Sequence, residues 1–485
     1  MRRIFLYLLA GVSIAAAQNP LGYSIATPRP INPAANTTTP SARAAQGQNP
    51  YLGSVPAPVT DTPLTISLSD AIQRGLGYNL GLIENVEGSA EARARRLRAL
   101  SALLPNITAH ASQNFDRLSL REIGLKLPPI PGFAGLPATT GNFRFEDARV
   151  QFNQSIYNRQ LRESYRSEQA SETASVANMK DARDVVVLAA GAAWFQVAAS
   201  KARVDAATAQ VVSARELDQQ TGDRVRSEVS PEIDGLRARV ERQTAEQRLT
   251  NAANDLEKDK LALARIIGLS VDQMFTVADP APLVPLVRVT QETARAEALR
   301  SRSDLASAEA TVRAAEFRVR SERAARYPTA GVSADYGAGG TSFAGSSQVY
   351  AVAASVSIPI YTGGRIRADI DAAASELARR QAELKDLQGR IAYDVRIAWL
   401  DVQASESGIA VAESNLQLAE QALTQAQDRY TNGVTNYLEV VQAQEAMAAA
   451  NENYITGLYS SNVARLSLAR AMGTAETRAT EFFGR

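Results

Sequence analysis

The residue types that most often carry out chemistry in proteins are sparse in this chain of 485 residues. It contains no cysteine, five methionines and a single histidine, His110. A zinc site needs several Cys or His ligands and a soft-metal site needs clustered sulfur ligands, so we expect neither. There is no phosphate-binding loop or nucleophile turn, and the carboxylates fall at helical surface spacing rather than in a defined pair. The sequence therefore predicts no enzyme, no metal and no cofactor.

The N-terminus indicates export. Arg2 and Arg3 precede an apolar run from Ile4 to Ile14 and three alanines, which is the pattern of a secretory signal peptide over residues 1–17. The alternative is a short buried helix. Removing this segment takes two of the 52 Lys and Arg and leaves 50 against 51 Asp and Glu, so no basic field predicts nucleic-acid binding. Without cysteine, neither disulfides nor a cysteine-linked lipid anchor are expected.

The next region differs in composition from the rest of the chain. Residues 18–60 hold eight prolines and two charged residues, Arg29 and Arg43, so we interpret residues 18–62 as an extended or disordered arm. No later stretch has eighteen consecutive apolar residues, which predicts no transmembrane helix. Integral contact with a membrane would then require a closed β-barrel.

The chain also matches itself, at a shift of 205 residues in most places and 223 further upstream. The difference of eighteen residues predicts a longer loop in the first half, within 115–143. We infer two structural repeats, 63–268 and 290–475, with a Pro-rich linker at 269–289 and a tail at 476–485. The matched pairs are Ala193-Trp194 with Ala398-Trp399, Asp223-Arg224 with Asp428-Arg429, Ala264 to Gly268 with Ala469 to Gly473, and Leu104-Pro105 with Tyr327-Pro328.

Both repeats read in the same order of elements. A helix, 67–103 or about 290–326, comes first, and Ser69 is expected to cap the first one. Strands follow, at about 106–116 and 143–156 in the first repeat and at about 329–337 and 348–360 in the second. Two long helices then meet at a tight turn, at about 222–231 or 431–436.

The strands are predicted from alternation of apolar and polar residues. One apolar and one polar face suits a barrel with lipid outside and water inside, although an edge hairpin of a soluble domain remains the alternative. Phe143 and Phe145 fall on the opposite parity, so a bulge or a later strand start is expected. The apolar sets are Ile107, Ala109 and Ala111; Ala148, Val150 and Phe152; Ala330, Val332, Ala334 and Tyr336; and Tyr350, Val352, Ala354, Val356 and Ile358.

The helices carry a heptad seam of mostly small residues, which lets neighbouring helices approach closely. The helix from about Asn158 to Thr221 would be roughly 95 Å long at 1.5 Å per residue, which no compact globular core requires. The seam of the second repeat comprises Ile391, Val395, Ala398, Val402, Ser405, Ile409, Ala412, Leu416, Ala419, Leu423, Ala426 and Tyr430, and the first repeat has a matching seam from Val186 to Ala214.

The two turns differ in sequence. Gly433 suits a left-handed helix end, whereas Glu228 stands at the matching place in the first repeat, so that turn is expected to have another geometry. There, Ser230 is expected to cap the next helix, with Pro231 at its first position.

Three segments, 356–365, 429–433 and 437–444, resemble the TolC-like outer-membrane efflux protein family. The first is similar to the strand-to-helix junction of the family, through Pro359, Gly363, Gly364 and Arg365. The resemblance covers about 64–475. It implies a mainly α fold with a β-barrel portion: a homotrimer with one twelve-stranded barrel in the bacterial outer membrane and an α-helical tunnel in the periplasm.

The resemblance also implies an aperture near the hairpin tips, formed by Asp234, Tyr430, Glu439 and Gln442. Carboxylates repeated around a three-fold axis would focus a negative potential, and Tyr430 would hold the closed state against a neighbouring helix, with Asp234 as a candidate partner. Gln442 stands where a family member with a double ring has an acid, and Thr435 where it has a base. The alternative is that Asp234 and Glu439 are ordinary solvated charges.

The tips themselves would dock a periplasmic adaptor, unless they are plain turns. The residues concerned are Glu228, Val229 and Ser230 in the first repeat and Gly433, Val434 and Thr435 in the second.

Together these features predict the passive exit duct of a tripartite efflux or type I secretion system. Its partners would be outer-membrane lipid, a periplasmic adaptor, and an inner-membrane pump of the RND, ABC or MFS class. The alternative is an exported coiled-coil adaptor or scaffold without a pore. The sequence leaves the transported substrate open.

Overall fold

The computed structural model describes residues 49–60, 62–119, 139–278 and 290–477. The predicted signal peptide, most of the predicted arm, and parts of the linker and the tail lie outside this range. The elements, in chain order, are η1 Pro50–Leu52, β1 Leu64–Ile66, α2 Leu68–Tyr78, α3 Leu80–Ser101, β2 Asn106–Asp116, β3 Phe143–Tyr157, α4 Arg159–Arg226, α5 Glu232–Ile267, β4 Phe275–Val277, α6 Gln291–Ser301, α7 Ser303–Ala324, β5 Thr329–Gly340, η2 Phe343–Gly345, β6 Ser347–Ser357, α8 Arg365–Thr431 and α9 Tyr437–Ala471.

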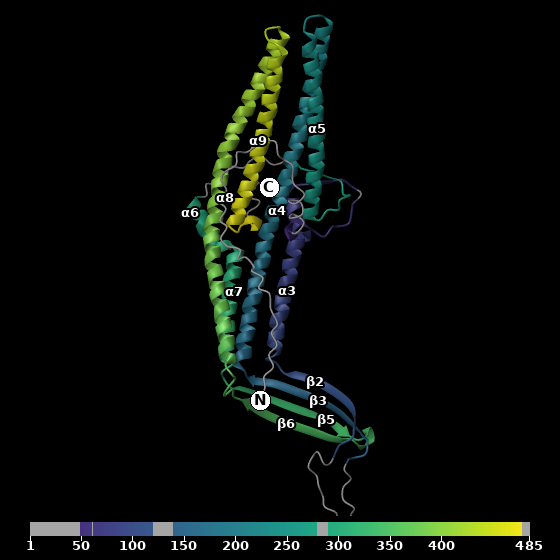
Figure 1. The fold of residues 1–485 in the computed structure, drawn as a ribbon, viewed down its shortest axis with the longest axis vertical. Helices are drawn as coiled ribbons and strands as arrows, with labels where there is room; N and C mark the ends of the chain where they lie inside the picture. The colour runs from purple at the N-terminus through teal and green to yellow at the C-terminus, as the bar shows by residue number, and fades with distance from the viewer. Residues whose placement is uncertain (1–48, 61, 120–138, 279–289, 478–485) are drawn as a thin grey trace, which may run out of the picture. The chain divides into compact units, whose positions relative to one another are not determined.

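Four strands form one antiparallel sheet in the order β2-β3-β5-β6. Each of these strands is joined to one helix, so the helices beside the sheet follow the same order, α3, α4, α7 and α8, with each packed on the next (Figure 1). Beyond them, α4 and α5 form one long hairpin and α8 and α9 form the other. The 68 residues of α4 correspond to about 100 Å of helix.

The register of the sheet separates its two faces. Ile107 lies opposite Phe152, Phe152 opposite Ala334, and Ala334 opposite Val352, so the apolar sets of the four strands share one face. Several of these large side chains are exposed, with Val352 at 72%. We name this the apolar face, and the opposite one the polar face. The expectation of a bulge near Phe143 and Phe145 is wrong: β3 is regular there, these rings lie on the polar face, and the irregularity falls between Ser155 and Tyr157.

The helix that precedes the strands is broken in both repeats, contrary to the prediction of single helices over 67–103 and 290–326. Asn79 and Arg302 have extended backbones, with ψ angles of 129° and 119°, which end α2 and α6. The two residues are related by the shift of 223. The side chain of Asn79 donates to the carbonyl of Ile266, and that of Arg302 donates to the carbonyl of Ala471, near the far end of the same repeat. The break is therefore a feature of the repeat.

Two predicted caps are also wrong. The residue that caps α2 is Ser67 rather than Ser69, in a capping box with Asp70. At the start of α5 the cap position is occupied by Pro231, and no side chain caps the helix, so Ser230 does not have the predicted role.

The buried cores lie midway along the long helices. In the first repeat, Trp194 packs with Phe195 and Leu263 among α2, α4, α5, β1 and β4, and its indole Nε1 donates to the carbonyl of Ile66 at 2.9 Å. In the second repeat, Ile391 and Leu466 anchor the matching core. Strand β4 lies inside the predicted linker and pairs in parallel with β1, which was not expected from the sequence.

The heptad seam of α8 is confirmed, because each of its predicted residues is buried or half-buried. In the described residues one helix, α4, contains a window long and apolar enough to cross a membrane, contrary to the sequence expectation. Half of that apolar stretch is buried inside the chain, as in the core helix of a folded domain.

Candidate functional site

The two hairpin tips have the same backbone geometry. In the first, Ser227 N donates to Asp223 O at 3.0 Å and Val229 N to Arg224 O at 2.8 Å; the residues 205 positions later make the same bonds at the same distances. Gly433 has φ of 72°, and Glu228 has φ of 59°. The prediction that Glu228 imposes another turn is therefore wrong: a non-glycine residue accepts the left-handed conformation.

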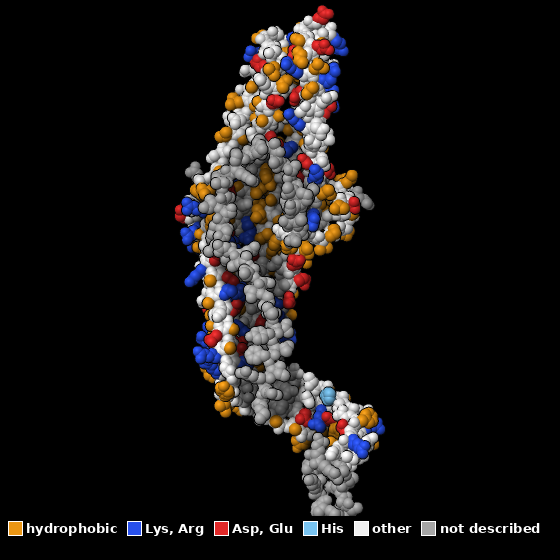
Figure 2. Space-filling model, in the orientation of Figure 1, with side chains coloured by type: hydrophobic (Ala, Val, Ile, Leu, Met, Phe, Trp, Pro, Cys, Tyr) orange, Lys and Arg blue, Asp and Glu red, His pale blue; other side chains and the backbone are white. Residues whose placement is uncertain are grey.

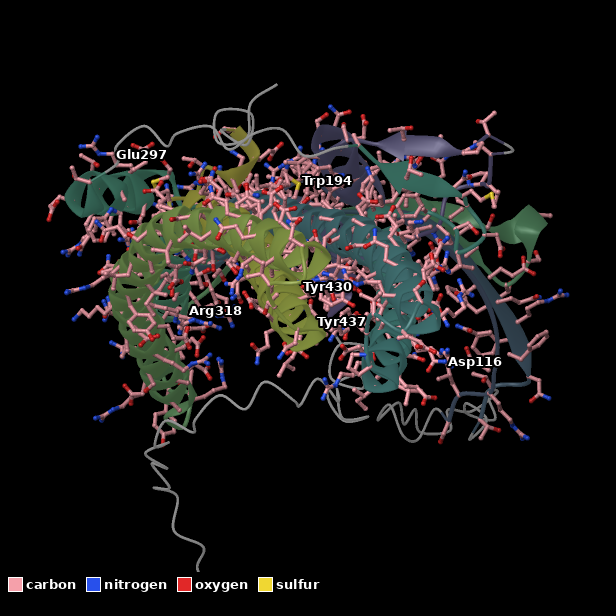
Figure 3. The ribbon with its side chains drawn as sticks, turned by 90° about the horizontal axis from the view of Figure 1, so that it is seen from above. Asp116, Trp194, Glu297, Arg318, Tyr430 and Tyr437 are labelled. Atoms are coloured by element: carbon pink, nitrogen blue, oxygen red, sulfur yellow. The ribbon has the colours of Figure 1, made fainter. Side chains whose placement is uncertain are left out.

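An apolar cluster joins the two tips. It takes one residue or more from each of α4, α5, α8 and α9, so it holds the two hairpins together as well as each hairpin internally. Tyr430 and Tyr437 pack edge to face with ring centroids 5.5 Å apart, between the two hairpins in the view from above (Figure 3). The cluster comprises Leu217, Ala238, Ala426, Tyr430, Tyr437 and Val440.

Polar contacts of Tyr430 also cross between the hairpins. Its hydroxyl lies 3.4 Å from Thr221 Oγ1 on α4. Arg224 Nη1 donates to the carbonyls of Tyr430 and Thr431 at 3.0 and 3.2 Å, and the guanidinium carbon lies 4.8 Å from the Tyr430 ring centroid. A cation at the carbonyl end of a helix and over an aromatic face is favourable on both counts. Tyr430 thus contacts α4 through Thr221 and Arg224, and these hydrogen bonds do not involve Asp234.

The two carboxylates of the predicted aperture are each paired with a cation of their own hairpin. Asp234, which is buried, accepts from Arg237 Nη1 at 3.4 Å. Glu439 lies 2.9 Å from Arg429 Nη1 and also accepts from the hydroxyl of Thr435.

Gln442 is exposed and takes the place that Arg237 has in the first repeat. The repeats therefore neutralise equivalent carboxylates with arginines from different positions. Burial raises the pKa of Tyr437, and the neighbouring acids Glu241, Asp218 and Asp234 raise it further, so its hydroxyl stays protonated.

The remaining predicted residues lie at the turns and at the end of the sheet. At the tips, Val229 and Val434 are related by the shift of 205 and are both exposed, at 65% and 68%. At the end of the sheet next to the helices, Pro359 lies between β6 and α8, Gly363 and Gly364 both have positive φ, and Arg365 pairs with Asp369 at 3.1 Å.

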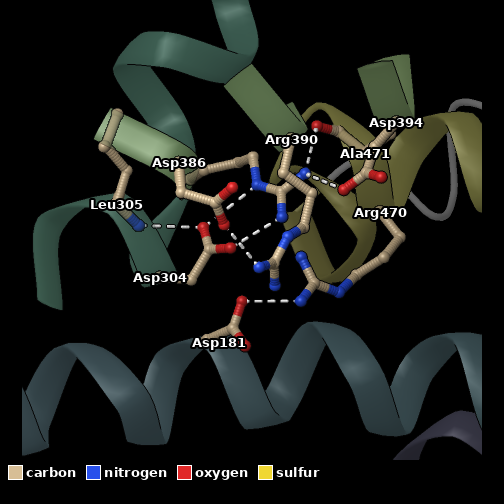
Figure 4. Close-up of polar contacts among 9 residues, drawn as sticks. Asp181, Asp304, Leu305, Asp386, Arg390, Asp394, Arg470 and Ala471 are labelled. Atoms are coloured by element: carbon tan, nitrogen blue, oxygen red, sulfur yellow. Dashed lines mark hydrogen bonds and ion pairs between the residues drawn. The ribbon is translucent and has the colours of Figure 1, made fainter. Parts of the chain in front are cut away.

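A second polar cluster, which the sequence did not reveal, links four helices far from the tips (Figure 4). At the α6–α7 break, Arg302 is 7% exposed and pairs with Asp304 at 2.6 Å and with Asp394 of α8 at 3.3 Å. Arg470 of α9 pairs with Asp181 of α4 at 2.7 Å. No spacing rule could find this cluster, because its ion pairs join residues as far as 92 and 289 positions apart in the sequence.

The comparisons with known proteins agree with this geometry. The family model described as outer membrane efflux protein matches residues 88–269 and 294–474, one segment within each repeat. The chain belongs to the outer membrane efflux protein family. Among curated relatives of this family, the outer membrane efflux protein BepC of Brucella suis biovar 1 (strain 1330) is 24% identical over 403 residues, which span 77% of this chain and 86% of that protein.

Solved channels have the same fold. The Campylobacter jejuni CmeC outer membrane channel aligns with a TM-score of 0.73 at 16% identity, over 88% of this chain and 92% of its own. The outer membrane protein VceC of Vibrio cholerae aligns with a TM-score of 0.70 at 19% identity, over 84% and 96%. Membership in the efflux family confirms the predicted family, an outer-membrane location, and a transport rather than an enzymatic role. The likeness to solved channels confirms a mainly α fold with a smaller β portion.

The strained tip gives a first prediction. A non-glycine residue in the left-handed conformation costs about 1 kcal/mol. Glu228→Gly removes that cost, so it should stabilise the first tip against local opening. Hydrogen exchange at the amides of Val229 and Ser230, which donate to Arg224 O, should slow roughly fivefold. The reciprocal control, Gly433→Ala, should accelerate exchange at Val434. Unchanged exchange at both tips would show that neither turn is strained.

The polar cluster that contains Asp181 and Arg470 gives a second prediction. Burial raises the pKa of Asp181, and Arg470 only partly opposes this. The folded protein therefore holds that proton to a higher pH than the unfolded chain, so this group favours folding as the pH falls from neutrality toward about 4, and the gain is lost as the pH rises. Asp181→Asn should lower the gain in Tm between pH 7.5 and 5 by about 2 °C. Asp255→Asn, at an exposed site on α5, should leave the gain unchanged, and an equal loss in both variants would contradict the assignment.

Proposed function

We propose that three copies of this chain form the passive exit duct of a tripartite efflux or type I secretion system. The observation that carries the proposal is the sheet. Among the described residues, its order leaves one edge of β2 and one edge of β6 without a partner strand, and the apolar face is exposed. Three such sheets joined edge to edge would close one twelve-stranded barrel, which satisfies the edges and places the apolar faces in lipid.

The helices extend this duct on the periplasmic side. Since α3 and α8 are the outer members of the layer beside the sheet, trimerisation would close the helices into a tunnel in the same operation that closes the barrel. The hairpin tips then lie at the far end of the tunnel from the membrane. The exposed Val229 and Val434, with Glu228, Ser230, Gly433 and Thr435, would meet a periplasmic adaptor that connects the duct to an inner-membrane pump.

Closure at the tips would depend on the contacts between hairpins. Tyr430, held by Thr221 and Arg224, fixes α8 and α9 against α4. Asp234 and Glu439 would be repeated around the three-fold axis, with Gln442 one turn beyond Glu439. Because Arg237 and Arg429 pair with these carboxylates, the aperture would be less negative than the carboxylates alone imply.

The main test is conductance of the purified mature protein in a planar bilayer. We expect discrete current steps and block by divalent cations from one side only. Glu439→Gln and Asp234→Asn should each raise the half-blocking concentration roughly tenfold, because each removes three charges from the aperture.

The outcomes separate the alternatives. An elongated particle that never conducts would overturn the duct in favour of the exported coiled-coil scaffold. Discrete steps with block unchanged in both variants would retain the duct and remove the carboxylates from the aperture.

A matched pair of arginines tests the closure. Arg224 contacts the other hairpin, whereas Arg429, its partner in the repeat, pairs with Glu439 of its own hairpin. Arg224→Gln should therefore raise the open probability of the channel roughly tenfold, about 1.4 kcal/mol, which is the scale of one half-buried cation–π contact with its hydrogen bonds. Arg429→Gln should change divalent block but leave the open probability unaltered. Equal open probabilities in the two variants would contradict the assignment of closure to Arg224.

A further inference from the structure

The charged residues of the polar face gather near the middle of the sheet. Directly opposite residues in antiparallel strands share a face, so His110, Arg149 and Gly337 lie side by side on this face, in three neighbouring strands. Asp147 lies two residues before Arg149 on the same face. Asp335 lies two residues before Gly337, also on this face. Figure 2 shows charged side chains of both signs beside the single histidine over the sheet.

Three of these side chains form one connected group, which we name the charged triplet: Asp147, Arg149 and Asp335. Arg149 Nε donates to Asp147 Oδ1 at 2.7 Å, and its Nη1 lies 3.4 Å from Asp335 Oδ2. The side chains of Arg149, Asp147 and Asp335 are 32%, 18% and 28% exposed, so water reaches all three. Two acids and one base leave the triplet with a net charge of −1 per chain.

The backbone makes room for the arginine. A Cβ at Gly337 would lie 2.1 Å from Ala148 O and 2.7 Å from both Cα and Cγ of Arg149, distances that real Cβ atoms do not show. Glycine therefore lets the side chain of Arg149 lie across the neighbouring strand toward Asp335. The register and the absent side chain together fix where this charge sits on the polar face.

Other charges of the strands lie elsewhere. Within β2, β3, β5 and β6, Asp116 is on the polar face but at the end of its strand, and Arg144 and Glu146 are on the opposite face near the same end. Described residues of β6 include no charged side chain. Away from the strand ends, the Asp and Arg residues of the polar face are therefore those of the charged triplet.

We propose that the charged triplet sets the ion selectivity of the barrel section, as a girdle that favours cations, separate from the aperture at the hairpin tips. The inference rests on the proposed trimer, in which the polar face lines the lumen and the girdle carries a net charge of about −3. Twelve strands spaced about 4.8 Å apart and tilted about 40° give a barrel radius of about 12 Å. The Debye length is about 10 Å at 0.1 M salt and about 30 Å at 0.01 M, so at low salt the field of the girdle spans the lumen.

The test is the reversal potential of single channels in a KCl gradient at low salt and one fixed pH, expressed as the permeability ratio of potassium to chloride. Arg149→Gln makes the girdle more negative and should raise the ratio roughly twofold, whereas Asp335→Asn makes it neutral and should lower the ratio by a similar factor. Both shifts should vanish at 1 M KCl. Opposite shifts from neighbouring substitutions cannot come from a general loss of structure.

Arg144→Gln is the matched control. It removes the same charge from the same strand, but on the apolar face, so the permeability ratio should not change. If Arg144→Gln shifts the ratio and Arg149→Gln does not, the faces are reversed and the inference fails. Channels that conduct normally with one ratio in all variants would also overturn it while the proposed duct stands; a wild-type protein that never conducts would instead overturn the duct itself.

Discussion

Every strand of the four-stranded sheet is covalently continuous with one helix, and this constraint orders the rest of the molecule. Once the sheet has the order β2-β3-β5-β6, the helices beside it can only follow as α3, α4, α7 and α8. The alternation of side chains then assigns one face of the sheet to apolar residues and the other to polar residues, without any further choice. Among the described residues, edges without a partner occur in the sheet and in the helix layer on the same two sides, so the proposed trimer would satisfy both in one mode of association.

The duplication explains what the two halves share and makes their differences informative. Both tips use the same turn, although one places glycine and the other glutamate at the left-handed position. Both helix breaks donate a side-chain bond to an equivalent carbonyl, although one uses a neutral amide and the other an arginine held by two carboxylates. Arg224 and Arg429 stand at matching positions of the two repeats, yet Arg224 joins the two hairpins and Arg429 pairs within its own. The two repeats therefore share their turns and helix breaks but differ in the polar contacts that their side chains make.

Periodicity in the sequence was sufficient to predict the long helices and the strands. A seam such as Ile391 to Tyr430 reflects burial on one side of a helix, and an alternation such as Ala330 to Tyr336 reflects a strand with one apolar and one polar face. The helix breaks could not be predicted, since Asn79 and Arg302 leave the helical region to reach carbonyls nearly two hundred residues away. The turn at Glu228 misled for a similar reason: packing of the tip outweighs a local preference of about 1 kcal/mol. At the candidate site, the resemblance proposed Tyr430, Asp234 and Glu439, and only the structure shows which side chains contact them: Thr221, Arg224, Arg237 and Arg429.

The ion pair between buried Arg302 and partly exposed Asp394 has a mechanical consequence. Asp394 fixes α8 at one point, and Tyr430 lies 36 residues further along the same helix, or about 54 Å away. A rotation of α8 by about 5° around that point would move Tyr430 by about 5 Å. That displacement exceeds the length of any hydrogen bond at the tip, so a small rotation of α8 about Asp394 would be enough to separate the two hairpins at its end.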